Sequence, residues 1–592
     1  MKQSKYSYND STWLHFLLLV LWLVIGMVLR FTNLAAKPAS SIEIATMGFS
    51  LGHGFSQIPL DRVIDVSTLL SPLRFDSTIS PGDVLQRLMT ESTHPPLYFW
   101  LTFWWTKLFT SNGELVSLSV GRSLSAILGG LAIPAIFGFS WVAFRSKLIA
   151  HLAAALMAVS PYGIYLAQEA RHYTLTILWI IASLTCLMVA THCINRRTCL
   201  PIWVGCLWIV VNSLGIATHY FFSLALGAEA LTIVGLLLWD FNQQEGTQFS
   251  FSYWWRIGAV GLGTLVGCLV WLPVANGISS NELTDWIQTS YDLDDIWQTI
   301  PRLMAWLITM VMLLPIEGTP KVIVVISALV VLLLLIWLLP ALIRGWKSSL
   351  HSELHSELHS ELRLPLKVLI GYWLGAIIIF LLVIYGLGKD ISLAARYHFV
   401  YFPVVVVLIA VALTNLWQTP QAKAIAETKR HWFYAEGKRV AIVMLLMGFI
   451  GSLTVIGNYG FQKSRRSDSL ANHIQATSTV PSIVATTYET SSQLRELIAL
   501  ALSFERVKSQ TKSLFHQPKV PQFILVQQTV AKAEDTNLAT LSKILASQPK
   551  PLDLWGINLK VDSENLSQLN CIKDSKSKLS NSGYKNRLYH CH

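Results

Sequence analysis

The segment Val322–Ile343, VIVVISALVVLLLLIWLLPALI, contains no charged residue and decides the fold class. A helix needs roughly 20 consecutive apolar residues to cross the hydrocarbon core of a bilayer. Trp13–Phe31 and Val368–Leu387 are similar runs. The first of them is too long for a signal-peptide core and is followed by no small-residue cleavage site, so we expect it to be retained as the first helix. The chain is therefore predicted to be a polytopic α-helical membrane protein.

The composition of the whole chain supports this class. Of its 592 residues, 53% are hydrophobic and only 13% are charged, about half the charged share of a typical soluble domain. The net charge is +11, but basic residues of membrane proteins collect in cytoplasmic loops, where they set the orientation. We therefore expect membrane lipids as partners and no nucleic acid.

About eleven transmembrane helices are predicted from the apolar runs. They are Trp13–Phe31, Leu124–Phe144, Leu148–Leu166, Tyr173–Ala190, Leu200–Thr218, Phe221–Trp239, Ile257–Val274, Val322–Ile343, Val368–Leu387, Phe399–Trp417 and Val440–Ile456. Two further apolar stretches, Pro95–Phe109 and Leu303–Pro315, are short and rich in Trp. Tryptophan is enriched where a membrane meets water, so we interpret these two as interfacial helices.

The basic residues between the spans predict the orientation. With eleven spans and the N-terminus inside, all of the large basic groups face the cytoplasm. These are Arg145/Lys147, Arg196/Arg197, Arg344/Lys347, Arg363/Lys367 and the group Lys423, Lys429, Arg430, Lys438, Arg439. Counting Pro95–Phe109 as a span would place two of these groups outside. The loops 32–121 and 275–321 and the C-terminal tail are therefore predicted to lie on the outer face.

The chain is predicted to have two domains, a transmembrane domain 1–460 and a soluble domain 461–592. The tail has strand-like runs at Ser482–Tyr488, Gln522–Val526 and Leu552–Val561. Thr490 and Gln493 form a capping-box pair ahead of the helical run Leu494–Val507. The tail is thus predicted to be a small α/β domain on the outer face.

Two further features of the sequence concern metals and disulfides. Cys571 and Cys591 in the tail could form a disulfide if the tail lies outside the cytoplasm. The repeat His351–Leu362, HSELHSELHSEL, falls in a predicted cytoplasmic loop. A histidine cluster that binds metal is one interpretation of this repeat, and an insertion by replication slippage is the one we favour.

The polar residues that suggest chemistry all fall in outer loops or at outer helix ends. Burying an ionisable group within or beside a membrane span costs free energy, so such groups tend to mark functional sites. The segments are Ile42-Glu43, His94-Pro95-Pro96-Leu97-Tyr98, Gln168-Glu169-Ala170-Arg171-His172-Tyr173, His219-Tyr220, and Arg396-Tyr397 with Lys389 nearby.

Each segment supports a different role. Glu43 could act as a general base, although a solvated loop glutamate is the better explanation when the residue is taken alone. Acid, guanidinium and imidazole groups together in Glu169–His172 exceed what a helix end requires. Arg396 offers the planar, bidentate, permanently charged donors that suit a phosphate. Glu229 lies deeper in a predicted span, and we interpret it as a structural partner.

In their order and common sidedness, these motifs resemble the GT-C superfamily of glycosyltransferases. The similar group is the family 39-like membrane enzymes, which are related to protein O-mannosyltransferases and to aminoarabinose transferases of lipid A. The resemblance covers roughly residues 10–460. One position departs from the pattern, because the family usually has Asp-Glu where this chain has Ile42-Glu43.

The resemblance implies an inverting transfer of a sugar from a polyprenyl-phosphate donor to a glycan, lipid or protein acceptor on the outer face. It implies Glu43 as candidate base and Glu169 as a second acid, with the two as candidate ligands of a divalent cation. Two oxygen ligands are too few to hold such an ion tightly unaided. The remaining candidate substrate-binding residues are His94, Arg171, His172, Tyr173, His219, Tyr220, Lys389, Arg396 and Tyr397.

Two alternatives stay open at the level of sequence. A catalytically impaired homologue would bind lipid-linked sugars without efficient transfer, because Ile42 replaces the usual acid. A transporter or flippase would instead show polar residues at mid-membrane and inverted repeats. Apart from Glu229 the sequence shows neither feature.

Overall fold

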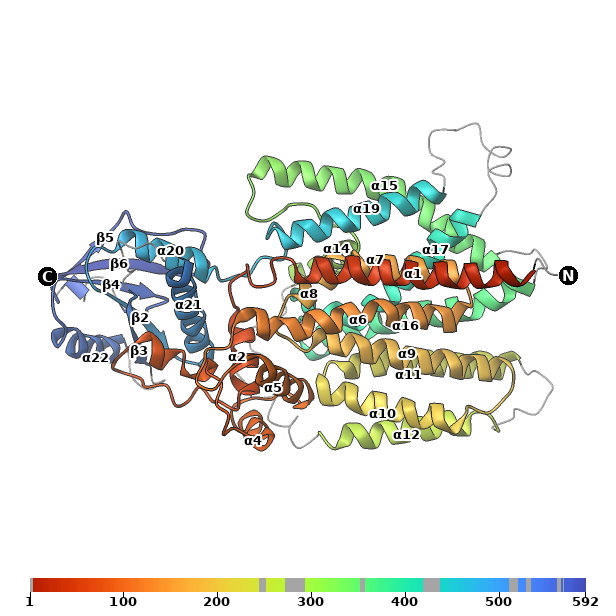
Figure 1. Cartoon of the computed structure of the whole chain (residues 1–592), viewed down its shortest axis with the longest axis horizontal. Coiled ribbons are helices and arrows are strands. Elements are labelled where there is room, and N and C mark those ends of the chain that lie inside the picture. The colour runs from red at the N-terminus through yellow and green to blue at the C-terminus, as the bar shows by residue number, and fades with distance from the viewer. Residues whose placement is uncertain are drawn as a thin grey trace. The chain divides into compact units, whose positions relative to one another are not determined.

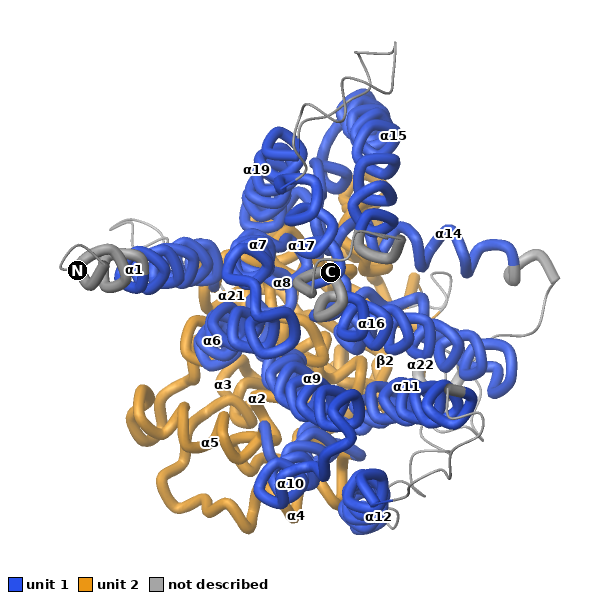
Figure 2. Tube along the Cα trace, turned by 90° about the vertical axis from the view of Figure 1, so that its right-hand side faces the viewer, with its two compact units in different colours: residues 1–34, 93–98, 122–462 blue, residues 35–92, 99–121, 463–592 orange. Residues whose placement is uncertain are grey.

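The fold was obtained as a computed structural model, which describes residues 4–243, 252–271, 293–351, 357–418, 437–510, 520–528, 534–561, 566–567 and 569–592. It contains two compact units (Figure 2). Unit 1 comprises residues 1–34, 93–98 and 122–462, and unit 2 comprises residues 35–92, 99–121 and 463–592.

Unit 1 is built from helices, which Figure 2 shows roughly end-on. The helices are α1 (Ser4–Phe31), α6 (Leu118–Phe144), α7 (Lys147–Ala158), α8 (Pro161–Ala167), α9 (Tyr173–Asn195), α10 (Ile202–Thr218), α11 (Phe222–Gln243), α12 (Trp255–Leu269), α14 (Leu293–Thr309), α15 (Lys321–His351), α16 (Glu357–Leu381), α17 (Phe402–Gln418) and α19 (Gly437–Ile456). A π-helical turn, Leu382–Gly386, continues α16, and the 3₁₀ turns η4 (Ile391–Leu393) and η5 (Ala395–Val400) lead into α17.

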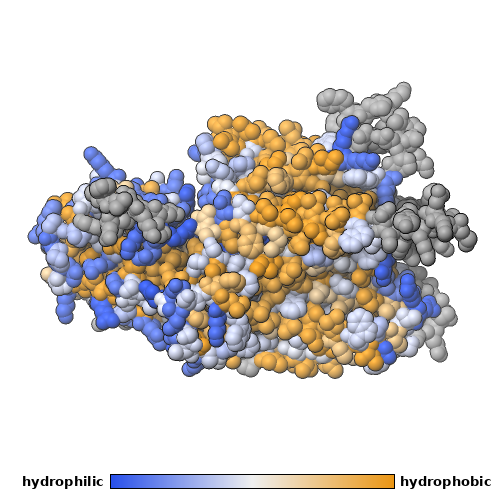
Figure 3. Space-filling view, in the orientation of Figure 1, coloured by the Kyte–Doolittle hydropathy of each residue, from blue (hydrophilic) through white to orange (hydrophobic). Residues whose placement is uncertain are grey.

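Helix α17 lies at the centre of unit 1. Every side chain from Phe402 to Thr414 is buried, and α7, α15, α16 and α19 pack around it. The outer helices are apolar on their exposed faces too, as Leu333 of α15 and Leu262 of α12 illustrate, each 65% exposed. Figure 3 shows apolar residues covering most of the visible face over these helices. Such a surface is stable in lipid and unfavourable in water, so the chain is an integral membrane protein.

Each predicted span overlaps a helix or a pair of helices of the structure. Among the described residues, seven helices are long and apolar enough to cross a membrane, and a bent pair, α7 and α8, makes an eighth. The shorter apolar helices are α10, α12 and α17. The two stretches predicted to be interfacial overlap α5 (Leu97–Phe109) and α14. With 13 and 17 residues, these helices are shorter than those that are long enough to cross a membrane.

The break between α7 and α8 was not expected from the sequence, which predicts one span over Leu148–Leu166. The two helices meet at 56°. Ser160 caps the second helix by accepting a hydrogen bond from Gly163 N at 3.0 Å, and Pro161 occupies its first turn. Buried Arg30 donates to the carbonyl oxygens of Met157 and Ala158 at 3.0 and 3.2 Å. The guanidinium thus satisfies carbonyls that the end of α7 leaves without helical partners.

Glu229 of α11 has the structural role that the sequence suggested. Its Oε2 accepts a hydrogen bond from Ser183 Oγ of α9 at 2.9 Å. The same oxygen of Ser183 lies 2.7 Å from Asn212 Oδ1 and accepts a hydrogen bond from Trp208 Nε1 at 2.8 Å. This buried network joins α9, α10 and α11, as expected for polar groups inside a helical membrane unit.

Unit 2 combines parts of the first predicted outer loop with the C-terminal tail. The loop gives α2 (Ser41–Ser50), β1 (Val63–Ile64), α3 (Val66–Leu69), η1 (Ser71–Leu73), α4 (Pro81–Glu91) and most of α5. The tail gives α20 (Ser467–Thr477), β2 (Ser482–Tyr488), α21 (Ser491–Gln510), β3 (Gln522–Gln527), α22 (Glu534–Ala546), β4 (Leu552–Ile557), β5 (Cys571–Asp574) and β6 (Asn586–Cys591).

These strands form one six-stranded sheet in the order β1-β3-β2-β4-β6-β5. Strand β2 pairs in parallel with both β3 and β4, whereas β1, β5 and β6 join antiparallel. Ile483, Ile524 and Leu554 pack with Leu541 and Leu545 of α22 on one face. On the other face, Phe523 contacts Phe504 of α21, and Trp555 contacts His473 of α20.

Several of the elements predicted in the tail are present in the structure. The strands β2 and β3 match the predicted runs closely, and Gln493 Oε1 accepts hydrogen bonds from the backbone and the hydroxyl of Thr490 at 2.9 and 2.7 Å. The third strand ends at Ile557 and not at Val561. The strands β1, β5 and β6 and the helices α20 and α22 were not predicted.

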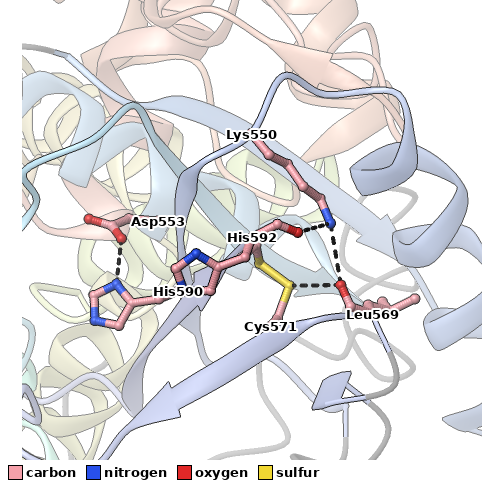
Figure 4. Close-up of a disulfide and its surroundings, with 7 residues drawn as sticks. Lys550, Asp553, Leu569, Cys571, His590 and His592 are labelled. Atoms are coloured by element: carbon pink, nitrogen blue, oxygen red, sulfur yellow. Dashed lines mark hydrogen bonds and ion pairs between the residues drawn. A yellow bond between two sulfur atoms is a disulfide. The ribbon is translucent and has the colours of Figure 1, made fainter.

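Cys571 and Cys591 form a disulfide that joins β5 to β6, where the two residues are cross-strand partners (Figure 4). Beside it, Lys550 Nζ donates to His592 O at 2.8 Å, and His590 pairs with Asp553 at 2.7 Å. The disulfide therefore ties the end of the chain to the sheet.

Several features singled out in the sequence lie outside the described residues. They are residues 352–356 and all side chains of the repeat 351–362, residues 275–292 of the loop 275–321 and, in the basic group, Lys423, Lys429 and Arg430.

Candidate functional site

Most of the residues predicted to bind substrate meet at one end of the helices of unit 1. His94 precedes α5, Arg171 and His172 precede α9, and His219 separates α10 from α11. The turn η5 supplies Arg396 and Tyr397 just ahead of α17. Residues from segments some 300 positions apart in the sequence thus form a site at helix ends, where polar side chains can meet water.

We define the His–Arg cluster as His94, Arg171, His172, Tyr173, His219, Arg396 and Tyr397. His172 lies at its centre. Its ring centroid is 4.2 Å from that of His219, 4.9 Å from Tyr173 and 5.7 Å from His94.

Arg396 joins the cluster through aromatic side chains. Its guanidinium lies over the ring of Tyr397 at 5.2 Å. Tyr397 in turn contacts Phe221 at 4.6 Å, and Phe221 contacts His219 at 5.3 Å. Arg171 lies in the same way over Tyr173, at 5.6 Å. Two permanent positive charges are therefore held against aromatic faces, which stabilise a cation and restrict its orientation.

Hydrogen bonds define which nitrogens of two histidines can donate. The backbone N–H of Phe221 donates to Nδ1 of His219 at 2.9 Å, so a neutral His219 carries its proton on Nε2. Arg171 Nη2 lies 3.2 Å from His94 Nε2. A guanidinium can only donate, so this nitrogen of His94 is the acceptor and its proton is on Nδ1.

His172 is fully buried, and neither of its ring nitrogens has a hydrogen-bond partner among the described residues. Burial, together with the neighbouring charges at His219 and Arg171, lowers the pKa of His172 well below its usual value of 6.5. The same causes, desolvation first and then His94 and Arg171, lower the pKa of His219. Both rings are thus neutral near pH 7 and can hydrogen-bond to a ligand without carrying charge.

The segment that carries Arg171 is held in place by two buried side chains, one of which the sequence did not suggest. Ser125 Oγ of α6 donates to the carbonyl oxygen of Arg171 at 3.0 Å. The Tyr98 hydroxyl lies 2.6 Å from the same oxygen of Ser125, and both side chains are buried. Tyr98 belongs to the quoted His94–Tyr98 motif, whereas Ser125 lies in an otherwise apolar helix and carries no signal of its own.

Two predicted substrate-binding residues are not seen to contact the cluster. Tyr220 turns toward Trp271, with the ring centroids 6.5 Å apart. Lys389 is partly exposed, and in the described part of the chain its side chain makes no hydrogen bond or ion pair. The neighbouring Asp390 instead pairs with Arg302 at 2.7 Å.

Glu43 belongs to unit 2, where Ser40 and Lys463 contact its carboxylate. It is the third residue of α2, and its Oε2 accepts hydrogen bonds from the backbone N–H and the hydroxyl of Ser40 at 3.0 and 3.1 Å. This is a capping box. The same oxygen lies 3.2 Å from Lys463 Nζ, and both side chains are buried. Ile42, in the preceding position, is partly exposed, whereas Glu43 is buried. The two positions that correspond to the family's Asp-Glu pair therefore differ in their exposure to solvent.

Glu169 is buried in unit 1, 4% exposed. Burial alone would lower the pKa of Arg396, but neighbouring tyrosines and Glu169 raise it above its usual value. A carboxylate thus lies within electrostatic reach of this cation.

Glu43 and Glu169 were also the candidate metal ligands. Among the described residues there is no group of three or more His, Cys, Asp or Glu that could hold a metal ion. Glu43 is already paired with an ammonium group, which competes with any cation for the same oxygen. The residues present therefore do not fit a tightly bound divalent ion.

The chain was compared with known proteins. No protein-family model and no curated protein sequence matches it. The structure is similar to the crystal structure of ArnT from Cupriavidus metallidurans in the apo state, with a TM-score of 0.52, 11% identity and 98% of each chain covered. The structure of the same protein bound to undecaprenyl phosphate matches with a TM-score of 0.49 and 10% identity, over 96% of this chain and 97% of that one.

A third similar structure is the archaeal oligosaccharyltransferase AglB from Archaeoglobus fulgidus in complex with an inhibitory peptide and a dolichol-phosphate. Its TM-score is 0.43 at 11% identity, over 83% of this chain and 64% of that chain. At such low identities the comparison describes the fold alone, and the apo ArnT structure is the match that supports it over the whole length of both chains. The chain has the GT-C fold, as its motifs predicted.

Proposed function

We propose that the protein is an inverting glycosyltransferase that moves a sugar from a polyprenyl-phosphate donor to an acceptor on the outer face of the membrane. The observation that carries this proposal is the His–Arg cluster. It combines two arginines held on aromatic rings with a buried neutral histidine, at the end of apolar helices. A polyprenyl chain requires the bilayer and its phosphate requires cations, so a site at the membrane boundary suits both parts of the donor.

The cluster would act mainly on the leaving group. The acceptor hydroxyl attacks the anomeric carbon and forms a new carbon–oxygen bond as the bond to the phosphate oxygen breaks. The polyprenyl phosphate leaves with the electron pair, and Arg171 and Arg396 offset its charge. Neutral His172 and His219 would hydrogen-bond to the phosphate or to sugar hydroxyls.

The proton of the acceptor needs a base, and two buried carboxylates are candidates. Glu43 is the residue favoured by the sequence motif, and Glu169 is the carboxylate within electrostatic reach of Arg396. General-base help is worth about 10²–10⁴-fold in rate. If one of these carboxylates serves as the base, replacing it by glutamine should lower the turnover far more than replacing the other.

The outer-face orientation and the eleven-span topology are part of the proposal. The positions of the basic residues between spans support them. The disulfide between Cys571 and Cys591 adds support from the tail, because such bonds persist mainly outside the cytoplasm.

A catalytically impaired homologue is the second candidate. The observation in its favour is that Ile42 replaces the family's acidic residue while Glu43 is engaged by Ser40 and Lys463. Such a protein would use the same cluster to bind lipid-linked sugars.

The test is transfer in vitro by the purified protein, offered a panel of polyprenyl-phosphate sugars and candidate acceptors. The wild type is compared with Glu43→Gln, Glu169→Gln and Arg396→Gln. Arg256→Gln is the matched control, because this guanidinium binds Leu200 O near the beginning of α10, whereas the cluster lies beyond the end of that helix. Full activity in both glutamate variants would refute the carboxylate assignment. Donor binding without turnover in the wild type would favour the impaired homologue.

A further inference from the structure

A second polar site lies in unit 2, at one edge of its sheet. It is a cavity of about 520 Å³, large enough for a small sugar. Thr487 and Glu489 line it from the end of β2, and Gly556 and Asn558 line it from the end of β4. Ser492 and Gln493, in the first turn of α21, complete this side of the cavity.

The topology of the sheet explains why a cavity forms here. The chain leaves β2 through α21 to reach β3 on one side, and then returns through α22 to β4 on the other side of β2 (Figure 1). In parallel α/β sheets, the crevice where successive connections diverge in this way, at the carboxyl ends of the strands, is the usual ligand site. Backbone N–H groups at the start of a helix beside it favour an anion.

The charges around the cavity are predominantly positive. Arg465, Lys560, Lys585 and Arg587 line it, against Glu489 and Glu496. Arg465 pairs with Glu496 at 3.0 Å, and Lys560 pairs with Glu489. The side chains of Lys585 and Arg587 are exposed, and no hydrogen bond or ion pair engages either of them within the described part of the chain.

Lys585, just before β6, and Arg587, in β6, both line the cavity. Lys585, Arg587 and Tyr589 alternate along the chain and all three line the cavity, as side chains on one face of a strand do. Asn558 Nδ2 donates to Glu496 Oε2 at 3.2 Å, and Lys560 N donates to Thr487 Oγ1 at 2.8 Å. The floor of the cavity is thus a fixed polar surface, with Lys585 and Arg587 along one wall.

We propose that this cavity binds a phosphorylated sugar, with Lys585 and Arg587 on the phosphate and the polar floor on the sugar hydroxyls. Arginine and lysine together match a doubly charged phosphate, and carboxylate and amide oxygens match hydroxyl donors. This proposal does not rest on the transferase reaction, because the site shares no residue with the His–Arg cluster.

The test is calorimetric titration of the full-length protein in nanodiscs of neutral lipid with glucose 6-phosphate, glucose, inorganic phosphate and dihexanoyl phosphatidic acid. Because the His–Arg cluster also offers cations, the titrations are made in the wild type and in Arg396→Gln. We expect glucose 6-phosphate to bind best in both proteins. Arg587→Gln should weaken it at least about tenfold, as expected for loss of a hydrogen bond to a charged group.

The matched control is Lys573→Gln, which removes an exposed positive charge from β5 of the same sheet, outside the cavity. It should leave binding unchanged. Equal binding by the wild type and Arg587→Gln would overturn the proposal, as would loss of binding in Arg396→Gln alone. Preference for phosphatidic acid over glucose 6-phosphate would identify a lipid headgroup and refute the sugar ligand.

Discussion

The His–Arg cluster of unit 1 and the Glu43 site of unit 2 both coincide with sequence motifs, yet their side chains are engaged differently. In the cluster, His172 is buried with both ring nitrogens without a partner among the described residues. At the other site, one oxygen of Glu43 accepts from Ser40 and pairs with Lys463. A group that the protein leaves unsatisfied is available to a ligand, whereas a satisfied one is already stabilising the fold.

This difference gives Glu43 a structural role whatever its part in catalysis. Its capping box starts α2, and its ion pair links that helix to the beginning of the tail.

The largest effect is expected for Glu43→Gln on stability. The variant keeps acceptors for Ser40 but leaves the buried ammonium of Lys463 without its counter-charge, which typically costs about 3–5 kcal/mol. Denaturant unfolding of the purified protein measures the change. The double variant Glu43→Gln/Lys463→Met should recover much of the loss. An unchanged unfolding midpoint in Glu43→Gln would show that the pair contributes nothing to the fold.

Arg396→Gln is expected to slow transfer by about 10²–10³-fold, or roughly 2.7–4 kcal/mol, the usual effect of removing one group that stabilises transition-state charge. The unfolding midpoint of the variant is compared with that of the wild type, so that a loss of transfer can be separated from a loss of folding. Turnover with saturating donor is the measurement. A comparable loss in Arg256→Gln would mean that the effect is not specific to the cluster.

Ile42→Asp is expected to raise the transfer rate by about 10–100-fold if the missing acid limits catalysis, since general-base help is worth at least that much. The side chain is partly exposed, so the new carboxylate is not buried. Ile42→Asn is the control for size and polarity without charge. No gain from the aspartate would favour Glu43 as the working base.

The smallest effect concerns pH. The pKa of His172 lies well below 6.5 in the folded chain. Above pH 6.5 the ring is therefore neutral in both the folded and the unfolded chain, and its titration does not change the free energy of unfolding. As pH falls below that value the unfolded chain binds a proton that the folded chain does not. Stability should thus fall by at most about 1.4 kcal/mol per pH unit from this residue until its folded pKa is reached.

His172→Phe should flatten that dependence. Denaturant unfolding of both proteins between pH 7 and pH 5 measures it. Parallel curves for the wild type and the variant would contradict the assignment of a neutral buried ring.

Local patterns in the sequence determined much of the fold. Apolar runs such as Val322–Ile343 predict helices because the bilayer demands about 20 apolar residues, whatever the neighbours. The strand Ser482–Tyr488 and the capping box of Thr490 and Gln493 are equally local. The motifs also indicated every member of the His–Arg cluster, since ionisable groups at membrane boundaries are rare enough to stand out.

The tertiary structure decided which residues are neighbours. It pairs Glu43 with Lys463 across more than 400 positions and adds β1 from the first loop to a sheet of the tail. It also turns Tyr220 away from the cluster and breaks α7 from α8. The sequence itself determines where a segment prefers helix, strand or lipid, because those preferences are local. Partners of a side chain depend on contacts between distant segments, and these exist only once the chain has folded.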